Sequence, residues 1–81
     1  MKVQVLFFSV LRDITGVAEA SFELMESATM GDLLGLIYER WPGLLKWDGS
    51  LLLAVDQTYV KRTELLHDGA EVAIMPPVQG G

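Results

Sequence analysis

The residues with the clearest chemical potential are the last six of the chain, Pro76-Pro77-Val78-Gln79-Gly80-Gly81. Two prolines keep the start of this segment extended, and six residues at about 3.3 Å each reach ~20 Å. That reach is enough to enter the active site of another protein. Because Gly80 and Gly81 add no side-chain bulk, the segment fits a narrow channel and would place its α-carboxylate where a partner's chemistry occurs.

The α-carboxylate of Gly81 must be activated before it can react. Its reference pKa is roughly 3.3 to 3.7, so at neutral pH it is an anion and a poor electrophile. Adenylation is the simplest activation, after which the carbonyl carbon can accept a nucleophile. The alternative is an inert, frayed terminus, which a Gly-Gly ending alone does not exclude.

Other motifs do not indicate a catalytic or metal site. The P-loop, GxGxxG, HExxH and GxSxG patterns are missing, and the sequence has no cysteine to act as nucleophile or thiolate ligand. His67 is the single histidine, and we expect a solvated turn residue rather than a ligand or base. Glu64, Asp68 and Glu71 surround that turn and are more typical of a solvated loop than of an acid/base pair. We therefore predict no metal site.

Composition and charge limit the class of protein. The 81 residues, 51% of them hydrophobic, fit one compact domain, which we place at residues 1–75 with an extended tail at 76–81. The formal net charge is −5 and no basic run is present, so we expect basic protein partners and no nucleic acid. No apolar run approaches the roughly 20 residues that span a bilayer, and Arg12 and Asp13 interrupt the signal-like start. We expect a cytoplasmic protein without membrane contact.

The elements that must position the tail can be predicted from periodicity. Residues 2–8 and 18–25 alternate as strands, and a short helical turn capped by Ser9 and stopped by Gly16 lies between them. Thr29 and Asp32 resemble a capping box that opens one long helix, residues 29–40, ended by Pro42-Gly43.

The second half of the chain reads as three strands. The apolar run 51–55 suits a strand covered on both faces, the pair 56–57 turns into a short strand at 58–61, and residues 63–69 form a loop. The last strand is 71–75 and ends at the prolines. The predicted class is α+β, a mixed sheet with one main helix. Its covered face would contain Val3, Val5, Phe7, Phe22, Leu53, Val55, Val72 and Ile74.

Several segments along the chain match one known family: residues 68–81, Val5-Leu6-Phe7-Phe8, Arg12 and Gly16, and Leu53-Ala54-Val55 followed by a polar pair and Thr58. On these residues the whole chain resembles the small, sulfur-carrying subunit of molybdopterin synthase. Asp56 stands where members of that family often have Asn, and either side chain tolerates a turn with positive φ.

This resemblance implies a β-grasp, ubiquitin-like fold and a mechanism. An E1-like enzyme would use ATP and magnesium to adenylate Gly81, and a sulfurtransferase system would convert the adenylate to a thiocarboxylate. The tail would then enter the large subunit, where sulfur passes to cyclic pyranopterin monophosphate to build the dithiolene of molybdopterin. The chain would be a non-catalytic carrier subunit of a two-subunit sulfurtransferase, with no permanently bound cofactor.

The resemblance also implies a partner-binding surface. Phe8, Arg12, Tyr59 and Met75 match positions where the family contacts its large subunit, and the tail from Pro76 through Pro77, Val78 and Gln79 would continue that contact. Leu6, Phe8, Tyr59 and Met75 fall on strand faces opposite the expected helix-facing residues. An exposed apolar patch with one arginine is typical of a binding face, so we expect Phe8, Tyr59 and Met75 to be substantially exposed in the isolated chain. A second layer of ordinary core is the alternative.

Two other functional interpretations stay open at this point. A related ubiquitin-like carrier or protein modifier would use Gly81 in thiazole synthesis, tRNA thiolation or conjugation to a lysine. A plain β-grasp interaction domain would make Gly80 and Gly81 dispensable. The Pro-Pro-Val ending favours the molybdopterin carrier over both.

Overall fold

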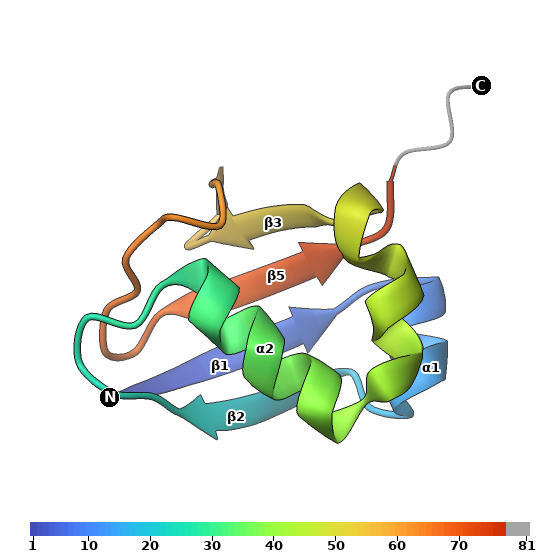
Figure 1. Ribbon diagram of the computed structural model, residues 1–81, viewed down its shortest axis with the longest axis horizontal. Coiled ribbons are helices and arrows are strands. Elements are labelled where there is room, and N and C mark those ends of the chain that lie inside the picture. The colour runs from blue at the N-terminus through green and yellow to red at the C-terminus, as the bar shows by residue number, and fades with distance from the viewer. Residues whose placement is uncertain (78–81) are drawn as a thin grey trace.

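The computed structural model describes residues 1–77, which form one five-stranded sheet with its helices gathered on one side (Figure 1). The strand order is β2-β1-β5-β3-β4. The elements are β1 (Lys2–Phe7), α1 (Val10–Thr15), β2 (Glu19–Glu23), α2 (Met30–Arg40), the 3-10 helix η1 (Pro42–Ser50), β3 (Leu52–Val55), β4 (Thr58–Tyr59) and β5 (Glu71–Met75).

The sheet is mixed, as the sequence predicts. β1 pairs antiparallel with β2 and parallel with β5, whereas β3 is antiparallel to both β5 and β4. The first and last strands therefore lie side by side at the centre, and the rest of the chain is wrapped around them. This arrangement confirms the α+β class and the β-grasp fold.

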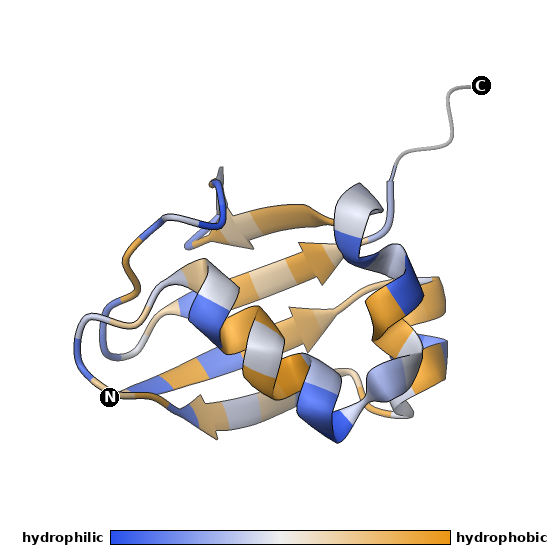
Figure 2. Cartoon of the chain, in the orientation of Figure 1, coloured by the Kyte–Doolittle hydropathy of each residue, from blue (hydrophilic) through white to orange (hydrophobic). Residues whose placement is uncertain are grey.

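The main helix, α2, begins where its capping residues place it. The Asp32 amide donates to Thr29 Oγ1 at 3.2 Å, and the Thr29 amide donates to Asp32 Oδ2 at 2.9 Å. This reciprocal pair satisfies two backbone donors that a helix start leaves free. The helix buries Met30, Leu33, Leu34 and Ile37, a spacing that puts them on one face. Figure 2 shows the resulting alternation of apolar and polar residues along α2.

α2 ends where it was predicted to end, but the helix η1 that follows it was not predicted. The Trp41 backbone N–H closes α2 with a 2.8 Å hydrogen bond to the Ile37 carbonyl oxygen, and Pro42 then starts η1. Proline suits a first helical position because the missing N–H has no partner there. Leu44 of η1 is buried against the core. The sequence does not reveal η1, because its apolar residues lack a clear helical period.

Two further local predictions have different outcomes. Gly16 ends α1 in the left-handed region (φ 78°), as predicted. The prediction that Ser9 caps α1 is wrong, because Ser9 has φ 52° and its side chain makes no capping bond. A side-chain cap requires the extended conformation that aims the hydroxyl at the first amides.

Strand boundaries differ from prediction by one or two residues at several ends. β1 stops at Phe7, β2 is 19–23 rather than 18–25, β3 is 52–55 rather than 51–55, and β4 is 58–59 rather than 58–61. β5 has the predicted bounds. Strand ends depend on the length of the neighbouring strand, which local patterns do not encode.

The core lies between the sheet and α2. Every residue predicted for the covered face is buried except Phe22, which is half-buried on the edge strand β2. The Arg40 guanidinium lies 5.7 Å from the centre of the Phe22 ring, so its side chain shields that edge.

The chain leaves the sheet at β5. Pro76 and Pro77 follow β5 outside any helix or strand. The division into a domain at 1–75 and a tail at 76–81 stays a prediction. Within residues 1–77, no helix combines the length and the apolar character needed to cross a membrane.

Candidate partner-binding face and root of the tail

The structure fixes the point from which the tail departs. Met75, the last residue of β5, is the register partner of Leu52 in β3. Pro76 cannot donate a backbone hydrogen bond, so it cannot extend the ladder. Pro76 and Pro77 are both half-buried. The other predicted tail residues, Val78, Gln79, Gly80 and Gly81, lie outside the described residues.

The strand registers align a row of residues across the sheet on the side away from α2. Leu6 of β1 pairs with Ala73 of β5, which pairs with Ala54 of β3, which pairs with Tyr59 of β4. Successive strand residues point to opposite faces, so this row lies opposite the buried row of Val5, Val72 and Val55. We call this side, with Phe8, Leu52 and Met75, the open sheet face.

Exposure on the open sheet face is uneven. Tyr59 is 71% exposed and Phe8 is 42% exposed, as predicted, and Arg12 on α1 is also exposed. Met75 is only half-buried, so the prediction that it is substantially exposed is wrong. The reason is that Met75 is still inside the sheet, paired with Leu52 on one side and followed by Pro76.

The predicted contact residues share a face but not one pocket. Phe8 and Arg12 line a shallow hollow with Leu6 at the end of β1. Tyr59 lines a second hollow with Leu52, at the opposite edge of the sheet. The structure therefore offers a broad apolar surface, which suits a protein partner better than a small ligand.

Leu52 belongs to this surface and was missed by the sequence interpretation. The run 51–55 is predicted to be covered on both faces, but Leu52 is only half-buried, on the open side. Ala54, on the same side, is buried, because its small side chain lies between larger neighbours. A continuous apolar run cannot show which of its two faces lacks a cover.

A second missed feature is an ion pair at the start of β5. His67 Nε2 lies 2.6 Å from Asp56 Oδ2, and His67 Nδ1 lies 2.9 Å from the Asp68 carbonyl oxygen. Both partners are acceptors, so the form of His67 that can make both bonds is the imidazolium, in which both ring nitrogens donate. The hydrogen bond to Asp56 raises the pKa of His67. The residue is exposed, as predicted, but it joins two turns instead of being merely solvated.

Asp56 is held on two sides. Its Oδ1 accepts the Glu71 amide at 3.0 Å, and that bond, followed by the His67 bond, lowers the pKa of Asp56. Asp56 and Gln57 both have positive φ, 49° and 71°, in the turn between β3 and β4. The hydrogen bonds of Asp56 to Glu71 and His67 therefore hold the β3–β4 hairpin, which carries Tyr59, against the start of β5.

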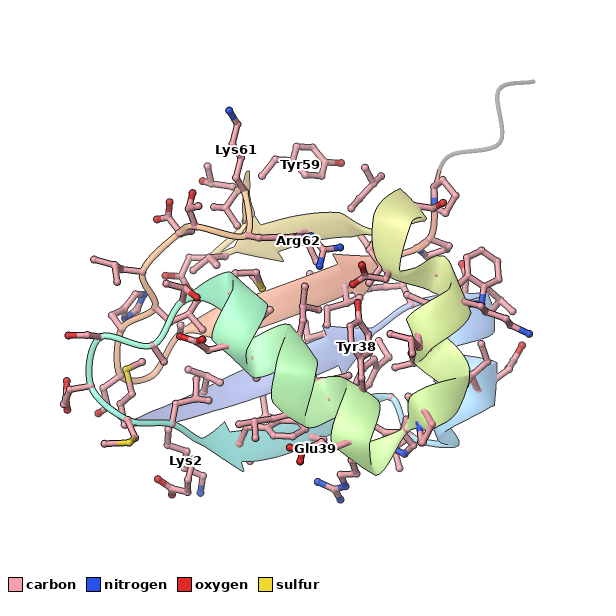
Figure 3. The ribbon with its side chains drawn as sticks, in the orientation of Figure 1. Lys2, Tyr38, Glu39, Tyr59, Lys61 and Arg62 are labelled. Atoms are coloured by element: carbon pink, nitrogen blue, oxygen red, sulfur yellow. The ribbon has the colours of Figure 1, made fainter. Side chains whose placement is uncertain are left out.

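A hydrogen-bonded cluster on the helix side joins three segments. The Tyr38 hydroxyl donates to Asp48 Oδ1 at 2.5 Å, and Arg62 donates to the same oxygen at 2.8 Å and to the Asp48 carbonyl oxygen. Figure 3 shows Tyr38 on α2 and Arg62 pointing toward each other. Burial, then the bond to Asp48, raises the pKa of Tyr38 to about 12. The cluster holds α2, η1 and the segment after β4 together.

The remaining candidate residues do not form an active site. Among residues 1–77, no group of three metal-ligating side chains is close enough to hold an ion. Asp68 accepts the Lys2 amide at 2.7 Å, and Glu64 and Glu71 are exposed, so the three carboxylates have separate environments. What the described residues present is a surface and the root of a tail.

Comparison with known proteins identifies the family of the chain. The model of the ThiS family matches residues 5–81. A protein of Chlamydomonas reinhardtii named molybdopterin synthase sulfur carrier subunit is 41% identical, over the whole of both chains. Its namesake from Escherichia coli is 37% identical over 98% of this chain and 99% of the relative. A solved structure from Pyrococcus furiosus, assigned to subunit 1 of a molybdopterin converting factor, superposes with TM-score 0.88 at 34% identity, covering 96% and 99% of the two chains.

Proposed function

The chain belongs to the ThiS family, and from that premise we propose that it is the sulfur carrier subunit of a molybdopterin synthase. Its role is then in the biosynthesis of the molybdenum cofactor. The observation that carries this proposal is the 41% identity to a sulfur carrier subunit over the whole of both chains. The family match runs through Gly80 and Gly81, so it includes the residues that would bear the sulfur.

The chemistry would take place at the Gly81 carboxylate. An E1-like enzyme with ATP and magnesium would join this carboxylate to AMP, with release of pyrophosphate. A sulfurtransferase persulfide would then attack the acyl carbon and displace AMP, and a thiol would cleave the resulting acyl disulfide to release the thiocarboxylate. The net change is one oxygen replaced by one sulfur, which gives a thiocarboxylate. Because the chain has no cysteine, it cannot carry the sulfur as a cysteine persulfide, so the sulfur must be bound to an acyl carbon.

The large subunit would receive the carrier through the open sheet face and the tail. Phe8, Tyr59 and Met75 would provide apolar contacts, with Arg12 beside them. The tail from Pro76 to Gln79 would lead the thiocarboxylate into the active site of the large subunit. There the sulfur would pass to cyclic pyranopterin monophosphate.

The stoichiometry follows from the product. A dithiolene contains two sulfur atoms, and each carrier delivers one, so two loaded carriers are consumed per product. A heterotetramer of two carriers and two large subunits satisfies this need. We place this assembly, and the ATP-dependent reloading of the carrier, in the cytoplasm.

The decisive experiment bypasses activation. Chemically prepared thiocarboxylated protein is mixed with the large subunit and cyclic pyranopterin monophosphate, without ATP or the activating enzyme. Dithiolene product is expected in this mixture and not with the unmodified carboxylate form. No product from a properly formed complex of the loaded carrier would show that the proposal is wrong.

A further inference from the structure

A groove opens between the end of β2 and α2, on the edge of the sheet opposite Tyr59. Leu24 and Ala28 form its buried floor. Met25 is 84% exposed and Leu36 is 37% exposed along its sides. We call this the β2–α2 groove. Met25 is the most exposed large apolar side chain among residues 1–77, on a surface that the proposed large-subunit contact does not use.

The strand beside this groove has a free edge. β2 is the first strand in the sheet order, so within residues 1–77 only β1 pairs with it. The Phe7 amide donates a hydrogen bond to the Ala18 carbonyl oxygen. The Leu24 amide donates to the Met1 carbonyl oxygen, and the Met1 amino group donates to the Leu24 carbonyl oxygen. Bonded residues alternate in an antiparallel pair, so the backbone groups of Glu19, Ser21 and Glu23 point away from β1. An unpaired edge of this kind is a template for an added strand.

The groove carries negative charge, and the basic side chain of Arg40 lies farther along the β2 edge, over Phe22. Glu23, Glu26 and Asp32 line the groove, and its lining within residues 1–77 contains no Lys, Arg or His. Lys2 is the nearest basic residue by register, because it pairs with Glu23 across the strands. Asp32 also accepts the capping bond from the Thr29 amide. A segment that docks here must therefore be basic as well as partly apolar.

We propose that the β2 edge and the β2–α2 groove bind an extended segment of a partner protein in which basic and apolar residues alternate. The segment adds a strand to β2. Its apolar side chains point to the helix side, against Met25 and Leu36. Its basic side chains lie on the other side of the sheet, near Glu19 and Glu23, and at the groove end near Glu26.

β2 and β4 are the two outer strands of the sheet, so a segment on β2 leaves Tyr59 uncovered. The two proposed surfaces meet at Glu19, which lines the same hollow as Phe8 and Arg12. The inference does not depend on the sulfur chemistry of the tail.

The test is an amide NMR titration of the full chain. The probe is a short, blocked peptide in which lysine and leucine alternate, added at low ionic strength. Chemical-shift changes are expected to centre on residues 19–36. Peptides with glutamate in place of lysine, or serine in place of leucine, should bind at least about tenfold more weakly. Shifts centred on Tyr59, or the absence of binding, would overturn the proposal.

Strand addition makes a sharper prediction about the peptide backbone. In an extended segment, the amides that face β2 belong either to all the lysines or to all the leucines. N-methylation of one residue type should therefore abolish the shifts, and N-methylation of the other should be tolerated. The residue type whose N-methylation abolishes the shifts shows the direction of the added strand. In an antiparallel pair the lysine amides bond to β2, because the lysines lie directly opposite Glu19, Ser21 and Glu23. In a parallel pair the leucine amides do so. Equal effects of the two methylation patterns would contradict strand addition.

Matched variants of the chain locate the contact. Met25→Ser should weaken binding of the lysine–leucine peptide by about tenfold. Leu45→Ser, at an exposed leucine on η1, should leave that binding unchanged. Glu23→Gln should weaken it by up to about fivefold, and Glu71→Gln should not. All four side chains are exposed, so the amide spectra should keep the folded pattern. Equal losses within either pair would overturn the proposal.

Discussion

Nε2 of His67 lies 2.6 Å from Oδ2 of Asp56, so that the loop before β5 is tied to the turn between β3 and β4. The bond raises the pKa of His67, and the pKa of Asp56 is lowered, first by the Glu71 amide and then by His67. The contribution of His67 to stability is fully present below 6.5, the pKa of histidine in the unfolded chain. It is lost as the pH rises through the raised pKa that His67 has in the folded protein. The Asp56 contribution is present above 3.8 and is lost as pH falls through the lowered value.

The pair should therefore stabilise the fold most between about pH 4 and 6.5. Raising the pH from about 6 to 8 should lower the parent's free energy of unfolding, because His67 loses its proton and with it the ion pair to Asp56. No other histidine contributes, since His67 is the single histidine of the chain. Asp56→Asn removes the ion pair, but asparagine accepts the same positive φ, so its drop over this range should be smaller. Urea unfolding at both pH values measures the difference. An identical pH dependence of parent and variant would show that the pair is broken in solution.

Tyr38 should titrate with a pKa of about 12. Burial is the largest cause and the hydrogen bond to Asp48 is the second, so Asp48→Asn should lower this pKa without restoring its ordinary value of 10.0. The measurement is the tyrosinate absorbance against pH, with Tyr59→Phe as background so that Tyr38 is the only tyrosine left. No change in the Asp48→Asn variant would mean that the Tyr38–Asp48 bond is not formed.

Truncation of the core should be costly on both sides of the α2–sheet contact. Leu34 on α2 and Ile74 on β5 are each 1% exposed. Replacement of either by alanine should lower the free energy of unfolding by roughly 2 to 5 kcal/mol, because the lost contacts leave a cavity. Leu45→Ala is the control, since that side chain is exposed and should change stability by less than about 0.5 kcal/mol. Denaturant unfolding decides, and a negligible loss at Leu34 and Ile74 would contradict the assigned faces.

Removal of the Tyr59 ring should separate binding from folding. Tyr59 is mostly exposed on the short strand β4, so Tyr59→Ala should leave the thermal midpoint nearly unchanged. Binding to the large subunit should weaken by roughly tenfold or more if the ring is buried in the complex. Calorimetry with the large subunit measures this loss, and Leu65→Ala provides an exposed apolar control. Equal affinity of the Tyr59 variant and the parent would exclude β4 from the interface.

Deletion of Gly81 should abolish sulfur transfer and leave the free energy of unfolding unchanged. The proposed chemistry needs the terminal carboxylate at the full reach of the tail, whereas the buried core residues found within 1–77 all lie at or before β5. Gly81→Ala keeps a carboxylate at that reach and should be impaired less than the deletion. Intact mass after incubation with the activating enzyme, ATP and a sulfur source reports loading, and dithiolene formation reports transfer. A deletion variant that still transfers sulfur would locate the chemistry elsewhere.

Several features follow from the sequence because their causes are local. The start of α2 depends on Thr29 and Asp32, three residues apart, and its buried face depends on a period of 3.6. The turn at Asp56 and Gln57 depends on residue types that tolerate positive φ, and β5 ends where Pro76 removes a donor. The candidate tail is also visible in the sequence alone, because its chemistry requires only its composition and its place in the chain.

Other features exist only after the strands are in register. Leu6, Ala73, Ala54 and Tyr59 come from four strands, and pairing alone brings them into one row. Asp56 and His67 are eleven residues apart and meet because both flank the β3–β5 pair. Alternation along a strand separates its two faces but does not show which face a helix covers. Only the packing of α2 on one side of the sheet decided that Leu52 belongs to the open face, and only the strand order put β2 at an edge.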